Sequence, residues 1–399
     1  MDTGQKNPPL GVLLAVMTLA HTVSAFGNLS IPPLTPFLRD ELNLTHAEVG
    51  LLMSFIYIGV VSASLFFGWI TDLLGERRVL PLGLGIQGIF MIIFAWVHTF
   101  LLGGFLLLLS GIGYSSVNPA TTKGVMRWFP PQGRATAMGI KQTGIPLGGI
   151  LAASTLPGLA LVFGWRVCIT LVSAATLVSI LAIRRGIPPA PPLQNQAAGM
   201  RRAQLREVLS NRSILALSIM GIFLAGAQLA ILTHLVLFLK KEYLFSTVLA
   251  GFFLALVQAG GIAGRIGWGL VSDFLAGGRR KSILVIIGII AVLQLFLLGR
   301  IGPEIPASLL VLFIILLGST TIGYHGVLFG LLGEIVRKEV VGLATGFSLT
   351  ITFLGIVLYP PIFGYLVDRL GSYSPAWDML AVSWVVALLI LIFFIHERK

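Results

Sequence analysis

Long apolar stretches, separated by short polar turns, make up most of the chain. A helix needs about 20 apolar residues to cross a hydrocarbon core of about 30 Å. Twelve stretches reach that length and predict twelve membrane-spanning helices. They lie near residues 10–38, 47–74, 79–98, 101–129, 135–162, 165–184, 212–240, 246–275, 281–299, 306–336, 341–368 and 374–395. The longest of them are expected to tilt or to extend beyond the lipid.

The composition indicates the same environment. Hydrophobic residues make up 56% of the 399 residues and charged residues 11%, whereas soluble domains carry about 25% charged residues. A soluble fold of this size cannot hide so much apolar surface from water, so lipid must cover much of it. The single cysteine, Cys168, excludes a disulfide framework and a cysteine metal cluster.

One long polar stretch, RRGIPPAPPLQNQAAGMRRAQLREVLSNR, separates the sixth and seventh segments. Its last part, 201–212, suits a short amphipathic helix on the membrane surface. The chain is therefore predicted to be an all-α membrane protein with a six-helix bundle over 1–185, a cytoplasmic linker over 186–211 and a second six-helix bundle over 212–399.

The positions of the basic residues predict the orientation. The net charge is +12, and with the N-terminus in the cytoplasm most Lys and Arg fall in inside loops, as the positive-inside rule requires. This placement accounts for the positive charge without nucleic-acid binding, and it puts both termini in the cytoplasm. The outside loops then hold Arg39, Arg166, Lys240, Lys241, Arg300 and Arg369.

Two charged stretches repeat at matching positions of the two halves. GWITDLLGERR occupies 68–78 and GLVSDFLAGGRR occupies 269–280, each at the cytoplasmic end of a predicted helix. In both, a Gly and an Asp four residues apart share one helix face. The Gly permits close approach of another helix, and the Asp suits the N-terminus of a neighbouring helix, where the dipole favours negative charge. The alternative is that such a stretch is only a basic cytoplasmic loop. That interpretation suits a single copy, but it suits two copies at matching positions less well.

The chain resembles the major facilitator superfamily at these residues. GWITDLLGERR looks like the family's loop signature between helices two and three, GLVSDFLAGGRR like its degenerate echo, and GIKQTGIPLGG like its helix-five signature. The resemblance implies two bundles that rock around a central cavity. It also implies gating roles for Gly68, Asp72, Gly75, Arg77, Arg78, Gly269, Asp273, Arg279, Arg280 and Arg134.

A latch between the bundles follows from the resemblance. Asp72 is expected to reach the start of helix eleven at 341–343, and Asp273 the start of helix five at 134–136. Both contacts form when the cavity faces outward and break when it faces inward. Helix four departs from the family pattern, since Leu107 stands where an Arg is often found. Proton coupling is therefore expected through a histidine or through the substrate itself.

The ionisable residues predicted at membrane depth are basic, and such residues are candidates for function. Arg265 follows Gln258 by two turns on one helix face, with no acidic residue at that depth. A guanidinium offers paired donors to a carboxylate, although bonding to backbone carbonyls is the alternative.

Further candidates line the predicted cavity. His325 and Tyr324 lie at a similar depth in helix ten. Each His also suits plain packing, and each Lys also suits a position with its ammonium at the surface. The other candidates for substrate binding are Tyr114, Asn118, Lys123, Lys141, His21, Asn28 and His234.

Together these features favour a gradient-driven transporter of a small anion, most plausibly a monocarboxylate, coupled to protons or another ion. A proton-driven exporter of drugs or cationic metabolites is the alternative, and a non-transporting sensor the third class. No catalytic triad, phosphate loop or metal-ligand pair occurs in the sequence, so we expect neither an enzyme nor a cofactor or metal. A monomer in the plasma membrane, the inner membrane of a bacterium, is expected.

Overall fold

The computed structural model describes residues 9–130, 134–189, 206, 209–275, 279–335 and 341–395. Most of the expected linker lies outside this range. The helices of the N-terminal half are α1 (Leu10–Asn28), α2 (Ile31–Leu42), α3 (His46–Leu74), α4 (Glu76–Ala95), α5 (Phe100–Tyr114), α6 (Val117–Trp128), α7 (Arg134–Gln142) and α8 (Gly144–Gly186). Those of the C-terminal half are α10 (Arg212–Glu242), α11 (Thr247–Leu270), a π-helical turn (Val271–Leu275), α12 (Arg280–Leu298), α13 (Ala307–Thr321), α14 (His325–Ile335), α15 (Val341–Leu370) and α16 (Ser374–Phe394).

Eleven helices or joined helix pairs among the described residues are long and apolar enough to cross a membrane. The longest, Ala137–Gly186, covers 50 residues, or about 75 Å as a helix, which is more than twice the hydrocarbon core. Gly164 interrupts it with φ 78° and ψ 156°, a backbone conformation that favours Gly. The two segments expected at 135–162 and 165–184 are thus joined by a sharp break rather than by a loop.

Helix breaks inside single apolar segments were not expected from the hydrophobic pattern. Prolines explain three of them, because Pro supplies no backbone N–H to the carbonyl four residues earlier. Pro32 and Pro33 follow the break between α1 and α2, Pro119 follows the break between α5 and α6, and Pro146 follows the break between α7 and α8. A fourth break separates α13 from α14. Such breaks leave helix ends and free backbone groups inside the protein.

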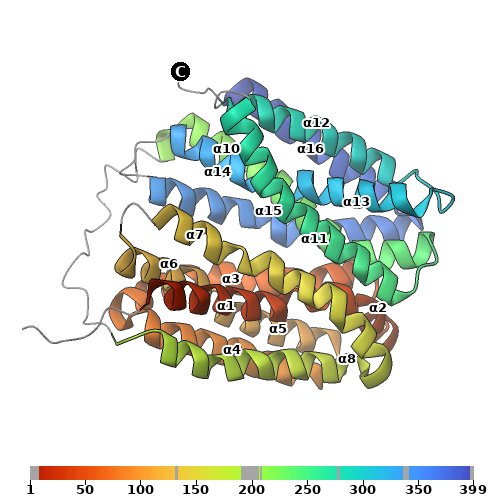
Figure 1. The fold of residues 1–399 in the computed structure, drawn as a ribbon. Coiled ribbons are helices and arrows are strands. Elements are labelled where there is room, and N and C mark those ends of the chain that lie inside the picture. The colour runs from red at the N-terminus through yellow and green to blue at the C-terminus, as the bar shows by residue number, and fades with distance from the viewer. Residues whose placement is uncertain are drawn as a thin grey trace, which may run out of the picture.

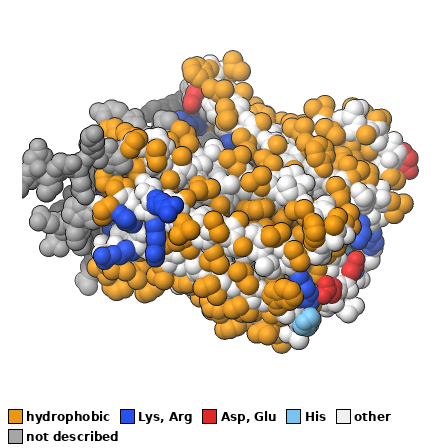
Figure 2. All heavy atoms as spheres, turned by 60° about the horizontal axis from the view of Figure 1, so that its bottom comes forward, with side chains coloured by type: hydrophobic (Ala, Val, Ile, Leu, Met, Phe, Trp, Pro, Cys, Tyr) orange, Lys and Arg blue, Asp and Glu red, His pale blue; other side chains and the backbone are white. Residues whose placement is uncertain are grey.

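The helices form two groups in Figure 1. Those of the N-terminal half lie in the lower part of the view, and those of the C-terminal half lie above them. The groups meet along three pairs of helices, α3 with α15, α8 with α11, and α2 with α10. The face shown in Figure 2 is largely hydrophobic, with charged side chains towards its two ends. We call these the Asp72 end and the His46 end, after residues at the last and first turns of α3.

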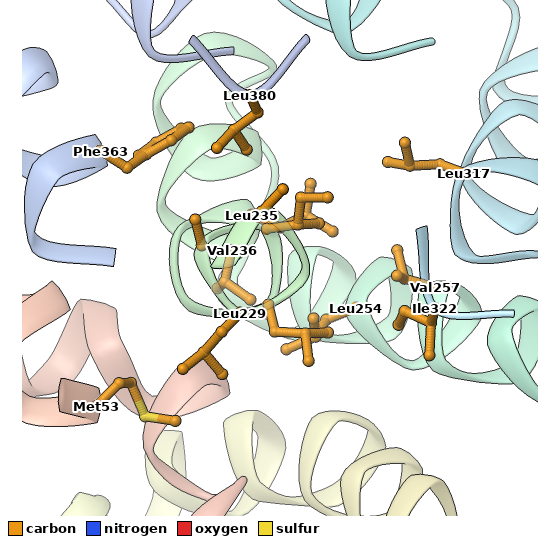
Figure 3. Packing of buried hydrophobic residues seen from close by; sticks show 14 of the residues in the cluster. Met53, Leu229, Leu235, Val236, Leu254, Val257, Leu317, Ile322, Phe363 and Leu380 are labelled. Carbon is orange, nitrogen blue, oxygen red and sulfur yellow. The ribbon is translucent and has the colours of Figure 1, made fainter. Parts of the chain in front are cut away.

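The helix α10 lies at the centre of the largest hydrophobic core. Leu229, Leu235 and Val236 of α10 point towards residues of several other helices in Figure 3. These neighbours include Met53 of α3 and Phe363 of α15, and all of these side chains are at most 3% exposed. Because α10 packs on helices of both halves, the core extends from one half into the other.

Candidate functional site

Glycines bring α11 against α13 and α14 near Arg265. A Cβ added at Gly264 would lie 2.3 Å from Ser319 O, and one at Gly326 would lie 3.0 Å from Arg265 O. The indole of Trp268 also donates to Ser319 O at 2.9 Å. Arg265 is therefore held on α11 directly beside the break between α13 and α14.

Arg265 carries a buried donor with no partner. Its Nε has no hydrogen-bond partner among the described residues. Its electrostatic neighbours include Tyr324 and His325. Tyr324 is 1% exposed, and its ring stacks on that of His325 with centroids 4.2 Å apart. His325 Nδ1 donates to Ile322 O at 3.0 Å, which holds the imidazole against the helix break. The structure thus brings three of the expected C-terminal residues together.

Lys141 is the centre of a second polar cluster, in the N-terminal half. Its side chain is 0% exposed, so it does not reach the surface. Its ammonium donates to Asn118 Oδ1 at 3.2 Å, Thr121 Oγ1 at 3.0 Å and Thr122 Oγ1 at 2.8 Å. His21 Nε2 lies 2.9 Å from the same Thr121 hydroxyl. These five residues form what we call the Lys141 cluster.

The register of α8 on α11 relates the two sites. A Cβ at Gly149 would lie 2.0 Å from Gln258 Nε2, and one at Gly251 would lie 2.7 Å from Ala153 O. The two helices therefore run antiparallel. Gln142, the neighbour of Lys141, ends α7 just before the break at which α8 begins. The two basic residues thus belong to opposite halves, Lys141 to α7 and Arg265 to α11.

Four other expected residues lie around these groups with different contacts. Asn28 accepts from Gln87 Nε2 at 3.1 Å, which links α1 to α4. Tyr114 ends α5 at a helix break. His234 is fully buried and donates from Nε2 to Pro360 O at 2.8 Å, a contact that suits packing of α10 on α15. Gln258 fills the space beside Gly149 and so belongs to the contact between the halves.

Lys123 does not lie in the Lys141 cluster. Its ammonium donates to Thr71 O at 2.7 Å and to Asp72 Oδ1 at 3.0 Å. The structure therefore places Lys123 at the Asp72 end, as a partner of the expected latch residue within the same half.

Among the residues that the structure describes, the ion-pair partners of the two latch carboxylates lie in their own halves. Asp72 is paired with Lys123, and Asp273 with Arg280 at 3.5 Å. Arg134 donates to the carbonyls of Phe129 and Met126. The described parts of α7 and α15 begin at Arg134 and Val341, within the ranges expected for the two helix starts. The side chains at 135–136 and 341–343 lie outside the described ones.

Close helix approach at the two latch glycines is expected when the cavity faces outward, and it is not seen among the described residues of this structure. A Cβ at Gly68 or Gly269 would meet nothing within 4 Å. Gly75 has a different role, because its φ of 79° ends α3 and starts α4. Arg78 and Arg279 are exposed and Arg77 is partly exposed. The halves are therefore apart at these positions of the Asp72 end.

A buried ion pair beside this end was missed by the reading of the sequence. Glu76 is 1% exposed and lies 3.2 Å from Arg127. It also accepts from the indole of Trp128 at 3.1 Å. In the sequence Glu76 looks like part of a solvated loop, and its partners are 51 and 52 residues away.

The halves touch closely at the His46 end. A Cβ at Gly50 would lie 2.3 Å from Pro360 O, and one at Gly364 would lie 2.1 Å from His46 O. Lys240 and Asp40 form an ion pair across the halves at 3.5 Å. Nearby, burial raises the pKa of Tyr243 to about 12, so its hydroxyl stays a donor to Ile301 O at any physiological pH. The structure is closed at this end.

Comparisons with known proteins agree with this architecture. The chain is 23% identical to the hexuronate transporter of Bacillus subtilis (strain 168), over 96% of this chain and 94% of that protein. It is 24% identical to a probable sulfoacetate transporter of Cupriavidus necator, over 91% of this chain and 88% of that protein. A crystal structure of a D-xylose-proton symporter matches with a TM-score of 0.80 at 17% identity, covering 98% of this chain and 99% of that one. The family model of the Major Facilitator Superfamily matches residues 17–329, and the chain belongs to this superfamily of membrane transporters.

Proposed function

We propose that this protein is a secondary active transporter of a small organic anion that carries a carboxylate, and that it works by alternating access with proton coupling. In this proposal the chain crosses the membrane twelve times as a monomer with two six-helix bundles. Both termini and the Asp72 end face the cytoplasm, in the inner membrane of a bacterium. The break at Gly164 and the distribution of basic residues support the crossing number and the orientation.

The observation that carries the proposal is the guanidinium of Arg265, whose buried Nε has no partner among the described residues. Arg stays charged at any working pH, and burying a polar donor without a partner costs about 1–3 kcal/mol. The helix break beside Arg265 offers Tyr324 as a further hydrogen-bonding group. A carboxylate bound here would accept two parallel N–H bonds from the guanidinium. The hexuronate and sulfoacetate transporters among the relatives are consistent with such a substrate.

The alternative, a proton-driven exporter of cationic compounds, lacks comparable support. Exporters of cations usually exchange the cation for a proton on a carboxylate inside the membrane. The buried carboxylate described here, Glu76, is engaged by Arg127 and Trp128 and lies at one end of the helices. The two separate positive side chains at mid-depth repel a cation rather than attract one.

A binding and transport experiment tests the proposal. The purified protein is screened by thermal shift and by uptake into proteoliposomes with D-glucuronate, sulfoacetate, L-lactate and a cationic dye. We expect one of the anions to bind and to be transported. Arg265→Ala should reduce the affinity for that anion by about 10- to 100-fold, because a hydrogen-bonded contact to a charged group contributes about 1.5–3 kcal/mol.

The controls separate binding from folding. Arg265→Lys keeps the charge but not the paired donors, so it should bind more weakly than the wild type and better than Arg265→Ala. Arg184→Ala, at an exposed position of α8, should match the wild type. Near wild-type affinity in Arg265→Ala would place the anion elsewhere, and transport of the dye alone would favour the exporter.

A further inference from the structure

The Lys141 cluster holds an ammonium in a setting that offers only neutral acceptors. Asn118, Thr121 and Thr122 accept all three of its N–H groups. Lys141 also lies in the last turn of α7, where the helix dipole favours positive charge. These contacts stabilise the charge without neutralising it.

His21 is joined to this ammonium through one hydroxyl. Thr121 donates its own proton to Val117 O at 2.7 Å, so its oxygen is free to accept from both Lys141 Nζ and His21 Nε2. With its proton on Nε2, His21 leaves Nδ1 as an acceptor, and this buried atom has no partner among the described residues. His21 is 2% exposed. The imidazole is thus a neutral base, one hydroxyl away from a buried cation.

The surrounding elements offer no carboxylate contact to this pair among the described residues. On α6, Lys123 and Arg127 are engaged by Asp72 and Glu76. On α8, Arg166 is engaged by Glu41 at the His46 end, and Arg184 and Arg185 lie in the last turn. The start of α4, which packs on α1, holds Glu76, Arg77 and Arg78, and Arg134 begins α7.

Two positive charges on Lys141 and His21 would repel each other in a low dielectric, so the pair accommodates one.

The opposite side of the interface supplies the missing negative charge only when an anion is bound. Arg265 lies on α11 of the other half, and α11 packs on α8, the helix that follows α7. Gln142 Nε2 and Lys141 Nζ share the acceptor Asn118 Oδ1, and Asn118 is exposed. Asn118 is therefore the exposed side of the cluster, through which an anion reaches Lys141.

We propose that Lys141, Thr121 and His21 form the proton-binding site of the transporter, in place of the membrane carboxylate that proton-coupled transport often uses. This inference rests on the proposed function. The pair binds one proton from water, either on Lys141 Nζ or on His21 Nδ1. Thr121 accepts from both side chains and so couples them, and the pair titrates as one unit. The bound anion favours protonation of the pair, and the protonated pair favours the anion. Both are therefore carried together, which makes the transporter a symporter.

The experiment separates proton coupling from anion binding. Wild type, Lys141→Met and His21→Asn are reconstituted, and D-glucuronate, sulfoacetate and L-lactate are used as probes. One assay measures accumulation driven by a pH gradient, and the other measures exchange of labelled for unlabelled anion at equal pH on both sides. We expect both variants to lose at least about ten-fold in the accumulation ratio, while exchange continues with a raised KM.

Three further variants keep the result decisive. Thr121→Val should uncouple the proton as the two variants do, and Thr121→Ser should restore coupling because it keeps the hydroxyl. Lys281→Met and His98→Asn remove the same residue types at helix ends away from the cluster, and both should accumulate the anion like the wild type. If Lys141→Met fails to fold, the comparison of Thr121→Val with Thr121→Ser still shows whether the cluster couples the proton.

Three outcomes would overturn the inference. Wild-type accumulation by Lys141→Met and His21→Asn would show that the proton binds elsewhere. Loss of exchange together with accumulation in folded variants would show that the cluster binds the anion itself. Absence of exchange of all three anions by the wild type would refute the proposed function and this inference with it.

Discussion

The carboxylate of Asp368, near the end of α15, lies 2.7 Å from His46 Nδ1, at the first turn of α3. It also accepts the backbone N–H groups of His46 at 3.0 Å and Ala47 at 2.8 Å. These donors are the unpaired groups that begin every helix, and the helix dipole favours a negative charge at this point. The contact joins the two halves at the His46 end, in the same way that the latch was expected to join them at the Asp72 end.

Asp368→Asn should open the His46 end more often. The substitution removes the charge that the first turn of α3 favours, which is worth about 1 kcal/mol or about a five-fold change in the open population. The measurement is the alkylation rate of Ser54→Cys in a Cys168→Ala background, because Ser54 is buried between the halves and bonds to Val357 O. We expect a faster rate.

Asp378→Asn is the matched control for that experiment. Asp378 lies at the same end but pairs with Arg300 of its own half, so its substitution should leave the alkylation rate unchanged. Equal rates in Asp368→Asn and the parent protein would show that the carboxylate does not hold this end closed.

Asp72→Asn and Asp273→Asn should have the opposite effect on the same reporter. Both carboxylates are paired within their own halves here, and they are expected to cap α15 and α7 when the Asp72 end closes. Their loss should therefore favour the present state, with slower alkylation of the cysteine at 54, slower uptake and an unchanged melting temperature. The latch hypothesis fails if neither variant changes alkylation or uptake.

Glu76→Gln should destabilise the fold, unlike Asp72→Asn only four residues away. Glu76 is buried with Arg127, which is 12% exposed, and removal of one partner of a buried ion pair costs about 3 kcal/mol. We expect a melting temperature lower by several degrees, measured by fluorescence in detergent. Glu304→Gln, in an exposed loop, is the control. An unchanged melting temperature of Glu76→Gln would mean that solvent reaches this pair.

Gly149→Ala should disturb the contact between the halves. The added methyl would lie 2.0 Å from Gln258 Nε2, so the side chain of Gln258 must move or the two helices must separate. We expect uptake to fall several-fold and the double variant Gly149→Ala, Gln258→Ala to recover part of it, as a coupled pair should. Gly158→Ala, which meets nothing within 4 Å, is the control. Full activity of Gly149→Ala alone would argue against tight contact here.

Most helix boundaries could be predicted because hydrophobic length is a strong signal in a membrane protein. The segment expected at 47–74 is α3 over His46–Leu74, and the segment expected at 281–299 is α12 over Arg280–Leu298. The breaks were missed because an apolar window averages over them. Pro119 and Pro146 were visible in the sequence, but Pro is tolerated inside membrane helices, so the pattern alone does not place a break.

The candidate site was predicted less completely, because depth along a helix does not identify a side chain's partners. Lys123 and Lys141 look alike in the sequence, yet one reaches Asp72 and the other is enclosed by Asn118 and two threonines. Arg265 was identifiable as a basic residue without an acidic neighbour. His46 and Asp368 are 322 positions apart, and only the packing of α3 on α15 makes them a pair.

The contact of Gly149 with Gln258 has a mechanical consequence. The amide of Gln258 occupies the space that a Cβ at Gly149 would take. This contact opposes sliding of one half along the other, so the halves are expected to rotate about it, as about a fulcrum. Asp273 lies about 22 Å further along the helix axis, which makes that length the lever arm. A rotation of about 10° about this point then displaces the Asp72 end by about 4 Å. This displacement exceeds the length of a hydrogen bond, about 3 Å between donor and acceptor. Small angular changes at Gly149 are therefore enough to make or break the charged contacts at the far end of the lever.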